Sequence, residues 1–190
     1  MARGFVAVVP PRDVLDAVGK LSWRAAHRPS ELSLPRLVGP RWTTREKWHL
    51  TLQFLGTSVD LDAAADALAR VRAAPLQLRL GGVGGFPSER RANVLWIGVR
   101  DGTRDLSAVA SAVADAMTPV VGPPEARAFH PHLTLTRLTR PADLRLAVAA
   151  SRGPVGPAWT ADRLVLFESV TASSGAQYRV HADVALDRAE

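Results

Sequence analysis

The chain has no cysteine among its 190 residues, which excludes disulfide bonds and thiolate metal sites. It also lacks long apolar runs. Phe5–Val9 is too short for the core of a signal peptide, and no stretch approaches the length of a membrane span. The glycine-rich residues 81–86 lack the Gly-Lys-Ser/Thr element of a phosphate-binding P-loop. These absences predict a soluble, cytoplasmic protein with no membrane partner.

Lysine is scarce as well, since it occurs only at positions 20 and 47. Arginine therefore supplies nearly all of the positive charge, with a formal net charge of +6 and a pI near 11.1. Guanidinium groups match phosphate geometry and stack on bases, and a basic surface favours polyanions. A genome rich in arginine and alanine codons would give the same composition, so charge alone does not establish RNA binding.

One tetrapeptide, His-Leu-Thr-Leu, occurs at residues 49–52 and again at 132–135, a separation of 83 positions. Its apolar surroundings favour a strand in both places. Successive side chains of a strand point to opposite faces. The His and Thr of each copy therefore share a polar face, while both Leu side chains enter a core. Two such strands facing each other would line a cleft with two imidazoles and two hydroxyls, and the spacing of nearly half the chain is what a duplicated lobe would produce.

The two histidines, His49 and His132, suit acid–base chemistry because free histidine titrates near pH 6.5. The hydroxyls of Thr51 and Thr134 can hydrogen-bond the non-bridging oxygens of a phosphate. Such a cleft suits metal-free hydrolysis of a phosphodiester: one His takes a proton from water and the other protonates the leaving alkoxide, each contributing about 10²–10⁴-fold. One His-x-Thr alone is weak evidence, because core packing also produces it, but its repetition favours catalysis.

The remaining pattern predicts strands alternating with amphipathic helices in a single domain, residues 1–190, with two lobes. An irregular connection is expected at 28–41, and the glycines of 81–86 are expected to permit bulges or tight bends. Pro119 is expected to end one helix, and Pro141 to open another. This order of elements predicts an α+β fold with mainly antiparallel sheets. Strands are expected at about 5–9, 48–55, 76–80, 94–99, 132–138, 157–161, 163–170 and 177–186. Helices are expected from Asp13 onward and at 60–73, 103–117 and 141–150.

Several segments together resemble the two-histidine (2H) phosphoesterases, and within them the RNA 2′,3′-cyclic phosphodiesterases, also called bacterial 2′–5′ RNA ligases. The resemblance covers nearly the whole chain. It departs from the family at Lys47-Trp48, where relatives usually carry a Pro-Glu-Asn-Leu run, and over residues 24–41, so the shape of the substrate entrance is open. Besides both motifs, the matching residues are Phe5–Val8, Arg41-Trp42, Gly56, Val94–Val99, Arg137 and Leu166–Ser169.

The resemblance implies a bilobal protein with two antiparallel sheets backed by helices, pseudo-two-fold related lobes and a central active-site cleft. It implies His49 and His132 as catalytic residues, and Thr51 and Thr134 as substrate-binding residues. It also implies that Arg137 contacts the phosphate, with a surface arginine as the alternative. Phe129 is a further candidate for stacking on a base. The family works without a cofactor or metal, so none is expected.

Other histidines have plainer interpretations. His130 and His132 flank a proline and form a pair that would suit a metal site, but the sequence supplies no Asp or Glu at matching spacing. His27 and His181 are expected to be surface or structural residues.

Three functions remain open. The first is hydrolysis of RNA 2′,3′-cyclic phosphate ends to 2′-phosphomonoesters, with weak reverse 2′–5′ ligation. The second uses the same site on a small cyclic nucleotide, such as the 1″,2″-cyclic phosphate of ADP-ribose. The third is an RNA-end-binding module in which hydrolysis is incidental, against which the intact His and Thr pairs argue. A monomer is expected in each case.

Overall fold

Two antiparallel sheets dominate the computed structural model, which describes residues 3–123, 128–172 and 175–186. The four-stranded sheet has the order β3-β1-β8-β9, and the five-stranded sheet has the order β2-β6-β5-β4-β7. Every strand pair is antiparallel, so the predicted fold class is confirmed. The strands are β1 Arg3–Val8, β2 Arg41–Trp42, β3 Leu50–Thr57, β4 Leu76–Phe86, β5 Ala92–Asp101, β6 His132–Ala142, β7 Pro154–Ala161, β8 Arg163–Ala172 and β9 Gly175–Ala185.

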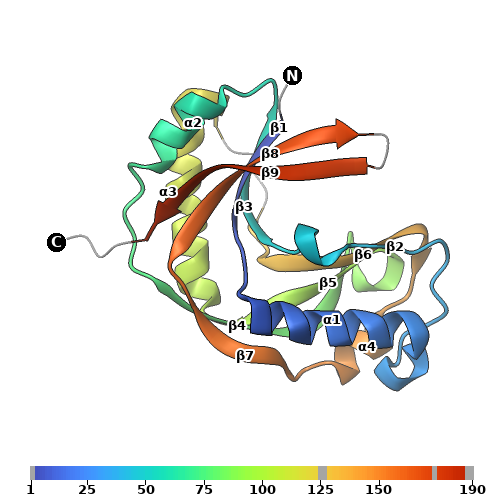
Figure 1. The fold of residues 1–190 in the computed structure, drawn as a ribbon. Helices are drawn as coiled ribbons and strands as arrows, with labels where there is room; N and C mark the ends of the chain where they lie inside the picture. The colour runs from blue at the N-terminus through green and yellow to red at the C-terminus, as the bar shows by residue number, and fades with distance from the viewer. Residues whose placement is uncertain (1–2, 124–127, 173–174, 187–190) are drawn as a thin grey trace.

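Each sheet carries helices on its outer side (Figure 1). The helix α2, Leu61–Leu68, packs on β8 and β9, and α3, Thr103–Val121, packs on β3. On the other sheet, α1, Arg12–His27, packs on β7, and α4, Arg145–Ala150, packs on β4. Within the described residues, no helix is both long and apolar enough to cross a membrane. Short 3₁₀ helices are η1 Pro29–Leu32, η2 Arg45–Lys47 and η3 Glu89–Arg91.

The two sheets share a plan, because each places a motif strand before three further strands: β3-β1-β8-β9 in one and β6-β5-β4-β7 in the other. The lobes are nevertheless not the two halves of the chain. The chain leaves the four-stranded sheet after β1, supplies α1 and β2 to the other lobe, and returns with β3. The near-half spacing of the motifs therefore goes together with two lobes of similar plan that are each assembled from interleaved segments of the chain.

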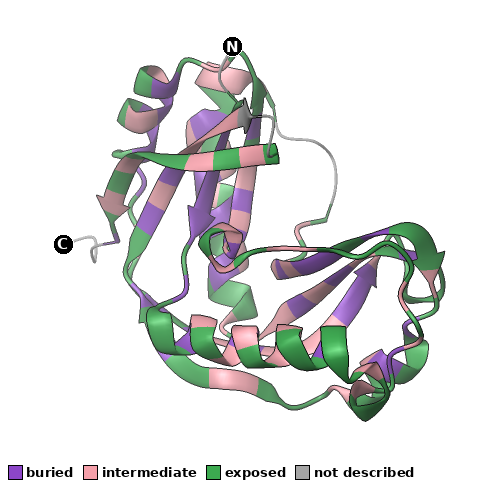
Figure 2. Ribbon diagram, turned by 45° about the vertical axis from the view of Figure 1, so that its right-hand side comes forward, coloured by how far each residue is buried: buried purple, intermediate pink, exposed green. Residues whose placement is uncertain are grey.

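The hydrophobic core forms where the sheets meet their helices, and Figure 2 shows the buried residues concentrated on the strands. In α1 the buried Val14 and Val18 are four residues apart and lie on one face, the spacing of an amphipathic helix. The leucines of both motifs, at 50, 52, 133 and 135, are buried. The core therefore holds both motif strands in register.

Two predictions based on proline are wrong: Pro119 does not end a helix, and Pro141 does not open one. Strand β6 continues through Pro141 to Ala142, and α4 starts only at Arg145, whose backbone N–H donates to the Asp143 carboxylate. The partner strand β2 pairs only with Thr136 and Arg137, so the missing N–H of Pro141 leaves no gap on that side of β6. Helix α3 likewise runs through Pro119 to Val121.

The glycine stretch lies inside β4 instead of between strands. The register of β4 against β5 shifts between Leu80 and Val83, and Gly82 in that interval has a φ of 70°. The predicted bulge is therefore confirmed, and only glycine adopts this conformation without strain.

Candidate active site

His49 immediately precedes β3, the edge strand of the four-stranded sheet. Leu50 and Leu52 point into the core, whereas Thr51 is half-buried on the opposite face with His49. Ala7 of β1 pairs with Thr51, so the neighbouring strand fixes the position of the motif. The predicted alternation is confirmed here.

His132 is the first residue of β6, and its motif alternates in the same way. Leu133 and Leu135 are buried, and Thr134 is half-buried on the opposite face. Strand β5 sets the register, since Trp96 pairs with Thr134. Although β3 and β6 belong to different sheets, they contact each other, and the charge of His132 acts on His49. The fold therefore brings the two motifs together.

Three aromatic rings surround the His49 imidazole. Phe5 stacks on it with the ring centroids 4.7 Å apart. Tyr178 meets it edge-on at 5.4 Å, and Phe167 lies at 6.1 Å. These rings fix the orientation of His49 and remove it from water.

Two aromatic rings surround the His132 imidazole in the other lobe. Phe86 meets it edge-on with the centroids 4.9 Å apart, and Trp96 lies at 6.0 Å. Trp96 packs so closely on Gly84 that any side chain at that position would overlap the indole ring. Gly84 thus allows Trp96 to support His132.

Each imidazole is also held by the backbone two residues upstream. The Nδ1–H of His132 donates to the carbonyl oxygen of His130 at 2.7 Å, and the His49 ring hydrogen-bonds the backbone of Lys47. Because a carbonyl oxygen only accepts, the hydrogen of neutral His132 resides on Nδ1. Its Nε2 then carries the lone pair that a general base requires.

Burial lowers the pKa of both histidines. For His49 the pKa falls to about 4, mainly through desolvation and slightly through the charge of His132, while the bond to Lys47 opposes the shift. Desolvation also lowers the pKa of His132, assisted by the positive charge of Arg137. In the free protein at neutral pH both imidazoles are therefore uncharged.

The two motif threonines have hydroxyls that are available to a ligand. Within the described ranges, no protein atom hydrogen-bonds the hydroxyl of Thr51 or of Thr134. A half-buried hydroxyl without a partner is suited to donate to an anionic oxygen. Both threonines thus remain candidates for phosphate binding.

A bulge in β6 places Arg137 on the face of the strand that carries His132. On a regular strand, residues five apart point to opposite faces, so Arg137 would face away from His132. The register against β5 shifts between Leu95 and Trp96, and the adjacent Leu135 and Thr136 are both buried. The extra residue reverses the alternation, and the Arg137 charge consequently acts on His132.

The equivalent bulge in β3 carries a different residue. Its register against β1 shifts twice, and Phe54, five residues after His49, is largely exposed. Phe54 also lies beside Phe5, with the ring centroids 6.2 Å apart. The two motif strands thus differ at this position, where β6 carries an arginine and β3 carries an apolar ring.

The other sequence candidates have different surroundings. Phe129 is half-buried against the hydrophobic core, so its role in stacking on a base stays a prediction. The His130 ring contacts Phe86. His27 stacks on Trp23 at the surface, and His181 bonds the Asp62 carboxylate at 3.0 Å. Among the residues that the structure describes, no three His, Asp or Glu side chains gather as a metal site would require.

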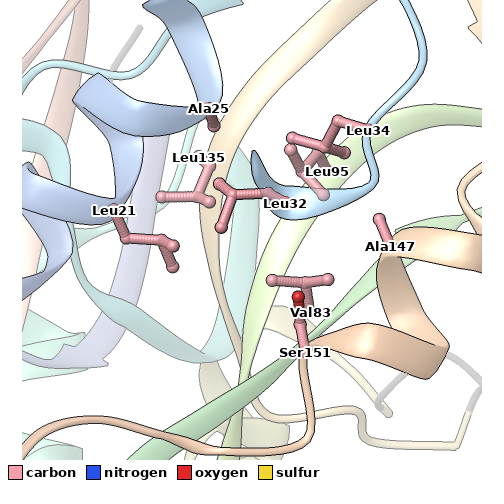
Figure 3. A pocket seen from close by; sticks show the side chains of 9 residues that line it. All are labelled: Leu21, Ala25, Leu32, Leu34, Val83, Leu95, Leu135, Ala147 and Ser151. Atoms are coloured by element: carbon pink, nitrogen blue, oxygen red, sulfur yellow. The ribbon is translucent and has the colours of Figure 1, made fainter. Parts of the chain in front are cut away.

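A pocket of about 220 Å³ opens beside His49. It is lined by apolar and aromatic side chains together with one guanidinium and one carboxylate, namely Val9, Leu15, Trp48, Phe167, Tyr178, Arg45 and Glu46. The hollow in Figure 3 lies under α1 and η1, has a volume of about 10 Å³ and is lined almost entirely by apolar side chains. Of these two, the pocket beside His49 has the size and polarity to take part of a substrate.

Comparison with known proteins identifies the family of this chain. The family model described as the 2′-5′ RNA ligase superfamily matches residues 16–172, a range that contains both motifs and Arg137. The chain belongs to the 2′–5′ RNA ligase superfamily.

Similar proteins carry a consistent name. A protein of Aeropyrum pernix is 36% identical over 95 residues, which cover 49% of this chain and 54% of that relative. A protein of Escherichia coli K12 is 31% identical over 137 residues, which cover 71% of this chain and 71% of that relative. Both are named RNA 2′,3′-cyclic phosphodiesterase. The match thus spans about half the length of the first relative. The crystal structure of TT0787 from Thermus thermophilus superposes with a TM-score of 0.75, at 26% identity, over 99% of this chain and 100% of that one.

Sequence reasoning missed the aromatic walls of this superfamily member. Phe5, Phe167 and Trp96 lie in segments that resemble the family, but nothing in their spacing connects them to the histidines. Only the sheet register does so, because Phe5 pairs with Phe167 across β1 and β8, and Trp96 pairs with Thr134.

Proposed function

We propose that this protein hydrolyses RNA 2′,3′-cyclic phosphate ends to 2′-phosphomonoesters by a metal-independent, two-histidine mechanism. The observation that carries the proposal is the pair of desolvated imidazoles at the start of two contacting strands, each followed two residues later by a threonine hydroxyl that no described residue hydrogen-bonds. The name of the two relatives supports the same substrate. Weak 2′–5′ ligation would be the chemical reverse of this reaction at the same site.

In the proposed reaction, water attacks phosphorus in line with the O3′ leaving group. His132 acts as the base, because its Nε2 carries a lone pair and takes the proton of the attacking water. The P–O3′ bond breaks, and protonated His49 delivers its proton to O3′. Thr51, Thr134 and Arg137 bind the non-bridging oxygens, where negative charge grows.

The acid role requires His49 to gain a proton that it lacks in the free protein at neutral pH. A bound phosphate diester places negative charge between the two imidazoles, and a nearby negative charge favours the imidazolium. Substrate binding is therefore expected to raise the pKa of the pair and to take up a proton. The two titrations are coupled and belong to the pair as a whole.

This coupling predicts two different pH profiles. Because burial lowers the pKa of both histidines, the singly protonated free enzyme exists mainly below the ordinary histidine value of about 6.5. We expect kcat/KM to peak below that pH and to fall about tenfold per pH unit above its upper limb. The kcat profile reports the enzyme–substrate complex, in which the bound phosphate stabilises the imidazolium, so this profile should lie at higher pH than that of kcat/KM. Steady-state rates from pH 4 to 9 test this, and a kcat/KM optimum on the alkaline side of neutrality would contradict it.

The product provides the direct test of the function. We expect oligonucleotides with 2′,3′-cyclic ends to give 2′-phosphates in excess EDTA, measured by chromatography against both phosphate isomers. The panel includes adenosine 2′,3′-cyclic phosphate and ADP-ribose 1″,2″-cyclic phosphate, so that it separates the RNA hypothesis from the small-nucleotide hypothesis. Mainly 3′-phosphate product would contradict the proposal, and loss in EDTA that one added metal restores would overturn the metal-independent mechanism.

A further inference from the structure

Two arginines lie directly opposite each other at the edge of the five-stranded sheet. Arg41 of β2 pairs with Arg137 of β6, and both side chains are exposed. Side chains directly opposite in an antiparallel pair have Cβ atoms about 5 Å apart, and like charges at that distance destabilise the sheet. The pairing therefore has a cost that a bound anion would offset.

No carboxylate in the described part of the chain forms an ion pair with either arginine. Other arginines of this protein do have such partners: Arg45 pairs with Asp16 at 2.6 Å, and Arg145 pairs with Asp143 at 2.6 Å. The positive charges of Arg41 and Arg137 can therefore be balanced by a bound anion or by solvent.

The segment that carries Arg41 is fixed along β6. Thr139 donates from its backbone N–H and its hydroxyl to the carbonyl oxygen of Val38, at 3.3 and 3.1 Å. Thr43 donates its backbone N–H to the carbonyl oxygen of Leu135 at 2.8 Å. The backbone of Arg41 is consequently held on both sides.

Strand alternation then sets the direction of the side chain. Trp42 packs on the hydrophobic core and pairs with Thr136, which is fully buried. Arg41 therefore lies on the opposite face, together with Arg137. Because the bulge in β6 puts Arg137 on the same face as His132, this face is the one that carries the candidate active site.

We propose that Arg41 binds the phosphate on O5′ of the terminal ribose, one phosphate away from the cyclic end held by Arg137. This inference rests on the proposed function. It makes Arg41 a specificity residue, because a nucleoside 2′,3′-cyclic phosphate lacks the second phosphate and an RNA strand has it. Two adjacent guanidiniums match two successive phosphates of one strand, and each supplies charge-assisted hydrogen bonds.

The test compares three substrates: adenosine 2′,3′-cyclic phosphate, its 5′-phosphorylated form, and the dinucleotide adenylyl-(3′→5′)-adenosine 2′,3′-cyclic phosphate. For Arg41→Ala we expect the loss of kcat/KM on the dinucleotide to exceed the loss on adenosine 2′,3′-cyclic phosphate by about ten- to hundredfold. The loss should appear mainly in KM. Arg41→Lys should lose less, because it keeps the charge.

The 5′-phosphorylated mononucleotide identifies the source of the second phosphate. A loss on it equal to that on the dinucleotide supports recognition of any O5′-phosphate, and a loss on the dinucleotide alone supports recognition of the RNA phosphodiester. Equal losses on all three substrates would overturn the proposal, because Arg41 would then act on the cyclic phosphate. No loss on any of them would overturn it as well.

Further readouts separate a phosphate contact from a structural effect. Arg41→Ala should not lower the melting temperature, because it removes like-charge repulsion. Binding of the dinucleotide is measured in the inactive His132→Ala background, with and without Arg41→Ala. Removing Arg41 should make the slope of log Kobs against log salt concentration shallower by about 0.7, the value for one phosphate contact on a single strand. Arg70→Ala is the matched control, because Arg70 is an exposed arginine that follows α2 in the other lobe. If wild type hydrolyses none of the substrates, the proposed function fails, whereas the ratio of wild-type to variant rates tests Arg41 alone.

Discussion

Replacing His49 or His132 with alanine is expected to lower kcat/KM by about 10²–10⁴-fold, since each variant lacks one proton-transfer group. The double variant should be little worse than either single variant, because groups that act as a unit are not additive. Steady-state rates on a dinucleotide 2′,3′-cyclic phosphate measure the effect. A single variant with more than about a tenth of the wild-type rate would show that its histidine is not an essential acid or base.

Matched controls distinguish catalysis from folding. His27→Ala removes an imidazole that stacks on Trp23 at the surface, and it should keep wild-type activity. Melting curves of both active-site variants should remain cooperative. Each of these two histidines contacts several aromatic rings, so His49→Gln and His132→Gln serve as second variants that preserve more of the packing.

A substrate with a nitrophenolate leaving group tests which histidine is the acid, because that group departs without a proton. His49→Ala should impair this substrate far less than the natural one, whereas His132→Ala should impair both. Equal damage from His49→Ala on both substrates would contradict the proposed assignment.

Arg137→Ala is expected to lower kcat by about 10²–10³-fold, the effect of removing one preorganised group that stabilises transition-state charge. Arg137→Lys should lose less, because it keeps the charge and gives up only the bidentate fork. Arg140→Ala, on the same strand, is the matched control and should stay near wild type. An Arg137→Ala variant that keeps half of the wild-type rate would contradict a role in catalysis and would favour the alternative, a surface arginine.

The pH profile provides a second readout for the same variants. The positive charge of Arg137 lowers the pKa of His132, so its removal should raise that pKa. The upper limb of kcat/KM should therefore move to higher pH in Arg137→Ala and remain in place in Arg137→Lys. A profile that is unchanged in both variants would contradict the electrostatic contact between Arg137 and His132.

Much of the arrangement of the candidate site was predictable from short-range pattern. The repeated His-Leu-Thr-Leu defines a polar and an apolar face on each strand, because the period of a strand is two. The burial of both leucine pairs confirms this. The element order likewise predicted an α+β fold, since it depends on local periodicity and turn residues.

Strand boundaries and helix ends were less predictable, because partners from elsewhere decide them. Pro141 remains in a strand since β2 does not extend to it, and the glycines of β4 bulge within a strand that β5 and β7 hold in place. Neither β2 nor β7 is adjacent in sequence to the segment that it pairs with.

Short-range pattern was enough to identify the candidate groups, two imidazoles and two hydroxyls with arginine as the dominant cation, and the strands that carry them. Three features depend on contacts in the folded protein: β3 and β6 meet, burial among aromatic rings lowers the pKa of both histidines, and a bulge turns Arg137 toward His132. The pairing of Arg41 with Arg137 also became visible only there. The physical reason is that alternation is a property of one strand, whereas register, bulges and desolvation arise from contacts between segments far apart in the chain.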